Sequence, residues 1–166
     1  MKDLEISCAD PRDERVRELV ERQLNFGRAF TPPEDVHALG ADELLDPAIV
    51  LFAARVDEDV LGIGALKEIE EGHGELKTMH TAEAARGRGI GRAMLEHLLA
   101  EARRRGYRRV SLETGAMDAF APARALYESA GFAACAPFGS YRRSPNSTYL
   151  SLALAAEPAR AEAAAP

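Results

Sequence analysis

The sequence predicts an α+β domain in which helices flank a mixed sheet of about seven strands. Three observations predict it. Short apolar runs bounded by turn residues occur in both halves of the chain. In the second half of the chain, two segments have apolar residues at the three- and four-residue spacing of a helix face. A glycine-rich turn joins a strand to the first of these two helices.

The first elements are a strand and a helix. Residues 4–8 alternate apolar and polar side chains, as in a half-buried strand. Asp10 can cap a following helix, and Pro11 suits its first turn. One face of that helix is apolar, with Val16, Leu19, Val20 and Leu24.

A helical insertion and two turns come next. Residues 31–46 start with two prolines and predict a loop with one or two short helices. The apolar runs 49–56 and 60–66 flank three acidic residues, which predicts a hairpin. Residues 72–74 form the next turn and lead into a strand over 75–81.

The second half predicts two helices that alternate with strands. The first helix has one apolar face, formed by Ile90, Met94, Leu95, Leu98, Leu99 and Ala102. Three arginines suit its last turn, and Gly106 suits the position just after it. A strand over 110–114 precedes the second helix, which has Pro122 in its first turn and Gly131 at its end. Two closing strands fit residues 132–135 and 147–154.

Length and composition indicate one domain, residues 1–154. The chain has 166 residues, of which 46% are hydrophobic and 29% charged, as in globular proteins. Residues 155–166 are rich in alanine and proline and predict a disordered tail. The sequence shows neither a signal peptide nor an apolar run long enough to span a bilayer. With two cysteines, too few for a disulfide framework, it predicts a cytoplasmic protein that does not bind membranes.

The charge distribution predicts a small anionic ligand. A net charge of −6 argues against a nucleic-acid partner, because binding to a phosphate backbone needs a basic surface. Arginines nevertheless crowd the central segment 86–109. An acidic protein with such a cluster suits one small anion better than a polyanion.

Residues 86–91 (Arg-Gly-Arg-Gly-Ile-Gly, the glycine turn) lie directly between a predicted strand and a helix. Glycines permit positive φ and close approach of a ligand, and the free N–H groups that begin a helix attract phosphate. Neither Gly-x-Gly-x-x-Gly nor Gly-Lys-Ser/Thr occurs here, which excludes the dinucleotide fingerprint and the nucleoside-triphosphate loop. An ordinary strand-to-helix connection remains the alternative interpretation of the turn.

Two motifs together resemble the GCN5-related N-acetyltransferases (GNAT). The Arg-x-x-Gly-x-Gly motif of the glycine turn is similar to their acetyl-CoA-binding motif, and residues 123–132 are similar to their Ala-x-x-Leu-Tyr-x-x-x-Gly-Phe segment. With the order of strands, the match covers roughly residues 4–154. Residues 32–39, 112–115 and 137–141 further resemble the YsnE-like group of bacterial acetyltransferases.

The resemblance implies a three-layer GNAT-like fold, with a mixed and mostly antiparallel sheet, and an acetyl-CoA-dependent N-acetyltransferase without a metal. It also implies that the strand before the glycine turn diverges from its neighbour. The N–H of Met79 would then face the thioester carbonyl as an oxyanion donor. The implied cofactor-binding residues are Met79, Thr81, Arg86, Gly87, Arg88, Gly89, Ile90, Gly91, Arg92, Phe120 and Tyr127. Phe120 stands where many relatives have an asparagine, so an apolar contact replaces a hydrogen bond to pantetheine.

The general acid and base follow from position and from the resemblance. Glu75 lies eleven residues before Arg86, where several relatives carry a catalytic glutamate. On regular alternation it shares a strand face with Lys77, Met79 and Thr81, and His80 points to the opposite face. The alternative interpretation of Glu75 is a solvated carboxylate at the end of the strand, or one paired with Lys77. The resemblance implies that Tyr127 protonates the leaving thiolate.

Glu113 is the second candidate base, and Glu113 and His37 are candidate substrate-binding residues. The insertion over 31–46 predicts a cap over a small pocket, which favours a small-molecule amine as the acceptor. The pair Arg142-Arg143 suits either an acidic group on that amine or a solvated turn. A protein or peptide N-acetyltransferase and a non-catalytic acyl-CoA sensor are the alternative functions. The oligomeric state, including a homodimer, stays open.

Overall fold

A computed structural model describes residues 3–155 of the protein. Seven strands form one sheet: β1 (Glu5–Cys8), β2 (Ile49–Val56), β3 (Asp59–Glu70), β4 (His73–Thr81), β5 (Arg109–Gly115), β6 (Ala133–Ala134) and β7 (Ser147–Ala153). Their spatial order is β1-β2-β3-β4-β5-β7-β6. The pair β4–β5 is parallel and the other neighbours are antiparallel. The predicted fold class, a mixed and mostly antiparallel sheet flanked by helices, is therefore confirmed.

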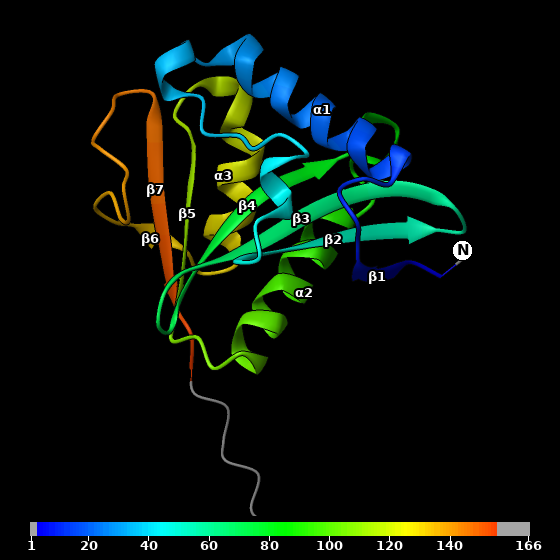
Figure 1. The fold of residues 1–166 in the computed structure, drawn as a ribbon. Coiled ribbons are helices and arrows are strands. Elements are labelled where there is room, and N and C mark those ends of the chain that lie inside the picture. Colours follow the sequence, from blue (N-terminus) through cyan, green and yellow to red (C-terminus); the bar gives the residue numbers. More distant parts are fainter. Residues whose placement is uncertain (1–2, 156–166) are drawn as a thin grey trace, which may run out of the picture.

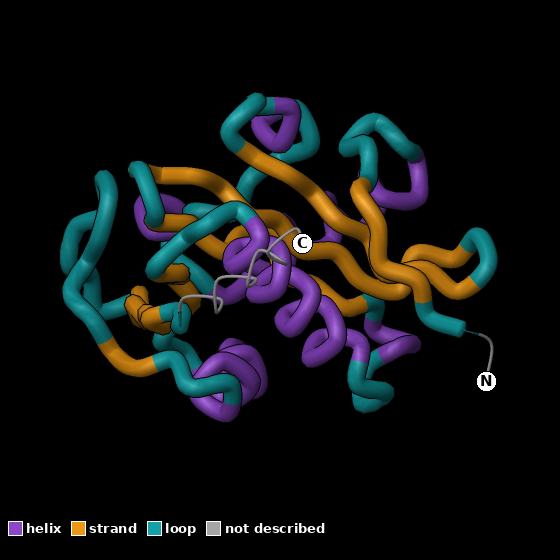
Figure 2. Tube along the Cα trace, turned by 90° about the horizontal axis from the view of Figure 1, so that it is seen from below, coloured by secondary structure: helices purple, strands orange, loops and turns teal. Residues whose placement is uncertain are grey.

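Helices cover both faces of this sheet (Figure 1). Helix α1 (Glu14–Phe30) packs on one face, where Val16, Leu19 and Val20 form a core with residues of β2 and β3. Helices α2 (Ile90–Arg104) and α3 (Ala121–Ser129) pack on the other face and share a larger core. Seen from below, a helix crosses the strands on the near side (Figure 2). The three layers place α1 and α3 on opposite sides of the sheet.

The first helix begins later than the sequence predicts. Asp13, not Asp10, is its N-cap and accepts hydrogen bonds from the N–H groups of Arg15 and Val16. Asp10 instead accepts from the backbone and side chain of Arg12, which keeps Pro11 outside the helix. The prediction failed here because either aspartate suits an N-cap, and the competing turn around Asp10 is formed by a local ion pair.

The segment 31–46 contains two short 3-10 helices, η1 (Pro33–Asp35) and η2 (Glu43–Leu45), as predicted. We call residues 31–46 the cap segment. It connects the end of α1 to the start of β2 (Figure 1). Two further 3-10 turns, η3 (Glu83–Ala85) and η4 (Asp118–Phe120), precede α2 and α3.

Strands β4 and β5 lie together at their beginnings and separate toward their carboxyl ends (Figure 1). The last pair of their ladder is Leu76 with Leu112, so residues 77–81 have no partner on β5. This divergence was expected from the resemblance. It opens the sheet at the ends of two parallel strands, next to the glycine turn.

A bulge at Thr78 changes the faces of β4. Thr78 has a φ of 57°, and the register with β3 shifts between Ile63 and Ala65. His80 is therefore paired with Ile63, on the face that carries α1 and also bears Lys77 and Glu75. The expectation from regular alternation, which put Met79 and Thr81 on the face of Glu75 and His80 on the other, is wrong, because an inserted residue inverts the alternation.

The predicted tail over 155–166 lies outside the described residues apart from Ala155, and the single-domain boundary stays a prediction. Within residues 3–155, none of the helices is both long enough and apolar enough to span a membrane.

Candidate active site

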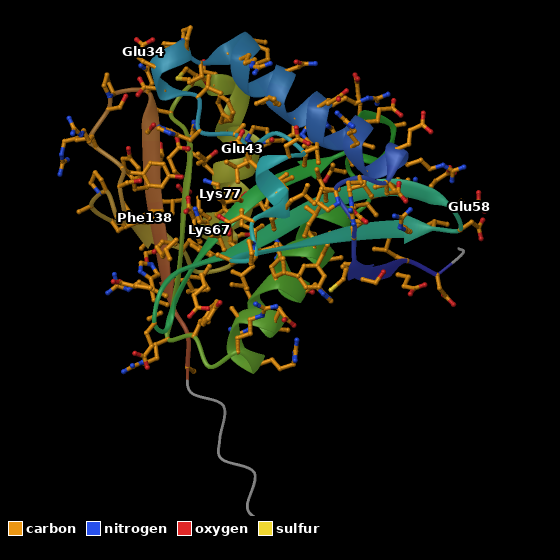
Figure 3. The ribbon with its side chains drawn as sticks, viewed as in Figure 1. Glu34, Glu43, Glu58, Lys67, Lys77 and Phe138 are labelled. Atoms are coloured by element: carbon orange, nitrogen blue, oxygen red, sulfur yellow. The ribbon has the colours of Figure 1, made fainter. Side chains whose placement is uncertain are left out.

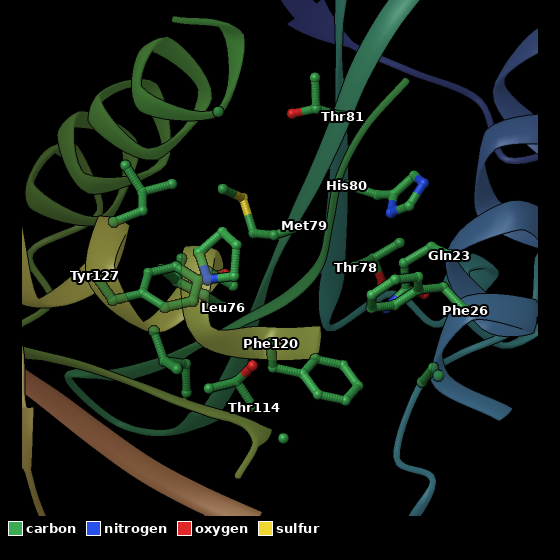
Figure 4. A pocket seen from close by; sticks show the side chains of 18 of the residues that line it. Gln23, Phe26, Leu76, Thr78, Met79, His80, Thr81, Thr114, Phe120 and Tyr127 are labelled. Atoms are coloured by element: carbon green, nitrogen blue, oxygen red, sulfur yellow. The ribbon is translucent and has the colours of Figure 1, made fainter. Parts of the chain in front are cut away.

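The opening between β4 and β5 is a cavity of about 500 Å³ (Figure 4). One side of its wall consists of α1, the cap segment and the end of β5. The other side consists of the glycine turn and the first two turns of α3. Residues 76–81 of β4 run between the two sides. The cavity therefore joins the glycine turn to a chamber under the cap segment.

The glycine turn has the geometry of an anion site. Gly87 and Gly89 have φ values of 76° and 80°, and a Cβ on either would meet no atom within 4 Å. Gly89 is the N-cap of α2, and no side chain caps the helix. The first N–H groups of α2 are therefore available to a ligand, and the helix dipole favours a negative one. Gly91 is tighter, because a Cβ there would lie 3.4 Å from Leu126 and 3.5 Å from the Thr81 hydroxyl.

The bulge sorts three site residues between the two sides (Figure 4). The side chain of Met79 packs with the core under α2, and that of Thr81 lies beside Gly91 of the same helix. His80 points toward α1 and contacts Phe26, with ring centroids 6.4 Å apart. The predicted cofactor-binding residues Met79 and Thr81 thus lie near the glycine turn.

Tyr127 lies in the wall on the α3 side, 6% exposed, with its ring against Phe132. Its hydroxyl has no hydrogen-bond partner among the described residues. Burial raises the pKa of this phenol well above its usual range. The hydroxyl therefore stays protonated at physiological pH, and its hydrogen is not held by any acceptor among residues 3–155.

Glu75 is held in an ion pair beside the cavity. Its carboxylate accepts a hydrogen bond from the Lys77 ammonium at 3.2 Å and one from the Tyr141 hydroxyl. Lys77 also donates to the Tyr141 oxygen at 3.0 Å. Glu75 lines a neighbouring hollow together with Lys67 and Glu43, but it does not line the cavity itself. Figure 3 shows Lys67, Lys77 and Glu43 on the strands and the cap segment at this hollow. The carboxylate that the sequence favours as a base thus has two donors already.

Glu113, near the end of β5, lines the cavity directly. Burial raises its pKa to about 7, and the negative charges of Glu75 and Asp35 contribute in the same direction. The Ser147 hydroxyl and the Lys77 ammonium offset part of this shift. A carboxyl with a pKa near neutrality is suited to accept and release a proton at physiological pH.

The two histidines at the cavity are uncharged near neutral pH. Burial lowers the pKa of His80 to about 4, with Arg86 and Arg22 acting in the same direction. Burial and the charge of Lys77 lower the pKa of His37. His37 packs its ring edge-on against Tyr141, at 4.9 Å between centroids. The geometry thus makes His37 part of the wall under the cap segment.

The cap segment is fastened to the loop that precedes β7. Asp35 accepts hydrogen bonds from Ser144 Oγ and Asn146 Nδ2, each at 2.9 Å. Asn146 and Ser144 lower the pKa of this carboxyl, which keeps it ionised. Gly27 of α1 faces the cap segment so closely that a Cβ would touch Ala38 at 3.8 Å. These contacts hold the cap segment in its place in the cavity wall.

Sequence reasoning missed several residues of the wall. Gln23, Phe26 and Gly27 lie seven positions after Val16, Leu19 and Val20, so they continue the buried face of α1 toward its carboxyl end. Their spacing of three and four residues was a visible signal. The clamp between Asp35 and the loop residues links segments more than a hundred positions apart, which no local pattern reveals. Arg142 and Arg143 are exposed and do not line the cavity.

No group of three or more potential metal-ligating His, Cys, Asp or Glu side chains occurs within residues 3–155. The described residues offer three features for chemistry: an anion-binding turn, a buried phenol and a carboxyl that titrates near neutral pH.

The chain is similar to known acetyltransferases over most of its length. The acetyltransferase (GNAT) family matches residues 14–132. YsnE of Bacillus subtilis strain 168, named an uncharacterized N-acetyltransferase, is 42% identical over 147 residues, or 89% of this chain and 97% of that protein. YedL of Escherichia coli K12, named likewise, is 43% identical over 139 residues, or 84% of this chain and 87% of that protein.

A crystal structure of the PaiA N-acetyltransferase from Thermoplasma acidophilum, in complex with coenzyme A, superposes with a TM-score of 0.72. The identity is 16%, and the match covers 92% of this chain and 99% of that one. This likeness supports the fold. The relatives confirm the predicted resemblance to the YsnE-like group.

The raised pKa of Glu113 predicts a pH-dependent stability. A carboxyl that is neutral in the folded protein up to about pH 7, but ionises near 4.5 when unfolded, makes stability fall as pH rises between these values. Glu113→Gln removes this loss. We expect the variant to gain on the order of 2 kcal/mol over wild type between pH 4 and pH 8.5, measured by urea unfolding.

Glu96→Gln, on the exposed face of α2, is the matched control and should show no such gain. If the difference in unfolding free energy between Glu113→Gln and wild type were the same at pH 4 and at pH 8.5, the pKa of Glu113 would not be raised by burial.

Proposed function

The chain belongs to the acetyltransferase (GNAT) family, and we propose that it is a cytoplasmic enzyme that transfers the acetyl group of acetyl-CoA to a primary amine of a small molecule. The amine attacks the thioester directly, in a ternary complex. One observation carries this proposal. A single cavity joins an anion-binding turn to a carboxyl with a pKa near 7, with the protonated Tyr127 in its wall.

The glycine turn fits the pyrophosphate of acetyl-CoA. The open space at Gly87 and Gly89 admits the phosphates to the N–H groups that begin α2. Arg86 and Arg88 are exposed beside them and can neutralise their charge. Arg92, one turn further, also donates to Ser129 Oγ of α3 at 2.8 Å and so links the two helices. Ile90, buried under the turn, holds the helix start on the sheet.

The unpaired end of β4 fits the pantetheine arm. Because residues 77–81 have no partner on β5, the arm can enter the opening and pair with the backbone at Met79 and Thr81. The N–H of Met79 follows the bulge directly and is our candidate oxyanion donor. The ring of Phe120, in the same wall, supplies an apolar contact where many relatives have an asparagine.

Acetyl transfer forms a C–N bond and breaks a C–S bond. The neutral amine attacks the thioester carbonyl carbon, and the developing oxyanion accepts from the Met79 N–H. As the intermediate collapses, the thiolate leaves and takes the proton of the Tyr127 hydroxyl. The proton lost by the amine nitrogen passes to the carboxylate of Glu113, directly or through one water. These steps leave Tyr127 as a phenolate and Glu113 protonated, so a proton returns from Glu113 to Tyr127 through solvent before the next turnover.

Glu113 is a better base than Glu75 on this geometry. Glu113 lines the cavity and titrates near neutral pH, whereas Glu75 accepts from Lys77 and Tyr141 outside it. Protonating Glu75 would cost its ion pair with a Lys77 that is itself largely buried. We therefore assign the proton transfer to Glu113 and a positioning role to Glu75.

The cap segment favours a small acceptor over a protein chain. An extended peptide needs an open groove, but here Asp35 ties the cap segment to the loop before β7, and His37 packs on Tyr141. A cavity of about 500 Å³ lies within the range of small-molecule sites.

Substituting Gly89 tests the cofactor site. Gly89→Asp adds a negative charge where the pyrophosphate should lie, and we expect calorimetry to detect no binding of coenzyme A. Gly106→Asp is the matched control, since Gly106 has a φ of 78°, equally open surroundings and a place after the far end of α2. Both variants should lose about 1 kcal/mol of stability from the strained backbone. Normal binding by folded Gly89→Asp would move the cofactor elsewhere.

Tyr127→Phe tests the general acid. Loss of the hydroxyl should lower kcat about 10²- to 10⁴-fold and leave the affinity for coenzyme A within a factor of about three, because the proton is needed only as the thiolate leaves. Tyr107→Phe, a buried tyrosine outside the cavity, should keep wild-type turnover. Thiol release followed with a chromogenic reagent measures the rate. Near wild-type turnover of Tyr127→Phe would make Tyr127 a core residue.

The pH profile of kcat/KM separates the two carboxylates. A base with a pKa of about 7 makes kcat/KM rise with pH through neutrality. Glu113→Gln should lose that limb and at least 10²-fold in rate, keeping only the limb from ionisation of the amine. Glu75→Gln should keep the limb. If instead Glu75→Gln loses the limb and Glu113→Gln keeps it, the roles are reversed.

A further inference from the structure

The acceptor side of the cavity has aromatic walls. Phe26 of α1 meets Phe120 edge-on, with ring centroids 5.3 Å apart, and also contacts His80 at 6.4 Å. The three rings come from different parts of the chain and line the same cavity (Figure 4). A flat apolar group fits such a chamber better than a flexible polar chain, because aromatic rings gain edge and face contacts.

The position of Phe120 is fixed by a glycine. A Cβ on Gly115 would lie 2.2 Å from the ring of Phe120, so the ring rests directly on the backbone at the end of β5. No other residue type leaves that space. Gly115, two residues after Glu113, thus lets the Phe120 ring lie in the wall of the chamber.

The charges on this side are negative. Asp35 is ionised, and Glu113 is partly ionised at neutral pH. Lys77 is the one lysine among the lining residues, and it is paired with Glu75. The lining arginine, Arg86, belongs to the glycine turn at the opposite end. A carboxylate on the acceptor would therefore meet two acidic groups and find no free cation, whereas an ammonium group would be attracted.

Two oxygens in the wall lack a donor. Gln23 Oε1 and Thr78 Oγ1 are buried, and neither has a hydrogen-bond partner among the described residues. Thr78 as a whole is 6% exposed, and both residues line the cavity (Figure 4). A buried polar atom without a partner is costly, so these oxygens are suited to receive N–H donors from a ligand. A primary amine brings such donors.

We propose that the acceptor is an aralkyl primary amine, with an aromatic ring on a short chain and no carboxylate beside the amine. The ring packs against Phe26 and Phe120, and the amine lies between Glu113 and the oxygens of Gln23 and Thr78. This inference rests on the proposed acetyl transfer and specifies its substrate class. Phe26 and Gln23 then determine specificity without taking part in the proton transfers.

Matched amines test the inference on the full chain with acetyl-CoA. 2-Phenylethylamine and phenylalanine differ by one carboxylate, and 2-phenylethylamine and butylamine differ by the ring. We expect kcat/KM for 2-phenylethylamine to exceed that for phenylalanine at least 100-fold and that for butylamine at least tenfold. Spermidine, a flexible polycation, is the fourth substrate and should be at least tenfold poorer. Faster acetylation of phenylalanine, butylamine or spermidine would overturn the inference.

Two variants connect this preference to the wall. Phe26→Leu keeps an apolar side chain and should reduce the preference for 2-phenylethylamine over butylamine at least fivefold. Gln23→Leu should raise KM for both amines with little change in their ratio. If Phe26→Leu keeps the full preference, the ring does not bind where proposed.

Calorimetry with coenzyme A distinguishes failure of the proposed acetyl transfer from failure of the proposed acceptor class. Cofactor binding together with acetylation of amines outside the proposed class leaves the acetyl transfer intact and rejects the aralkyl acceptor. Cofactor binding with no thiol release from any amine rejects the proposed transfer itself and the acceptor class with it.

Discussion

The break in β4 at Thr78 is the constraint on which the rest of the site depends. A β-branched residue at a φ of 57° is strained, and surrounding packing must hold it. Gly64 of β3 contributes, because a Cβ there would lie 2.9 Å from Met79 Sδ and 2.8 Å from Met94 and Leu98. The bulge places the Met79 side chain on the face of the sheet that α2 covers, and the His80 side chain on the face that α1 covers. One strand thereby serves both sides of the cavity.

The two carboxylates of the site differ by environment rather than by chemistry. Both are largely buried and lie on neighbouring strands, where Glu75 is paired with Ser111, two residues before Glu113. Glu75 has an ammonium and a phenol as donors, so its charge is compensated locally. Glu113 lacks an equivalent ion pair, and its pKa rises to about 7. Glu75 is thus ion-paired with Lys77, whereas Glu113, without such a pair, titrates near neutral pH.

Much of this was predictable from sequence where the pattern is local. The glycine turn, the face of α2 and the Leu-Tyr segment are contiguous, and the structure puts them where they were expected. The faces of β4 were not predictable, because counting by two fails at an inserted residue whose identity, threonine, gives no sign of positive φ. Lys77, two positions from Glu75, was a visible partner, but Tyr141 lies more than sixty positions from Glu75, and the loop before β7 lies more than a hundred from Asp35. Such contacts depend on tertiary packing alone.

Burial raises the pKa of both proposed proton carriers, Tyr127 and Glu113, and this serves opposite tasks. For a phenol, burial keeps the proton on the oxygen until the thiolate develops beside it in the proposed reaction. For a carboxyl it brings the equilibrium between acid and base close to neutral pH. The Glu75–Lys77 pair tunes the second case, because its two charges act on Glu113 in opposite directions. Removing Lys77 alone would leave Glu75 uncompensated and drive Glu113 toward its protonated form. In the proposed mechanism, the ion pair therefore tunes the base Glu113 although neither member needs to touch the substrate.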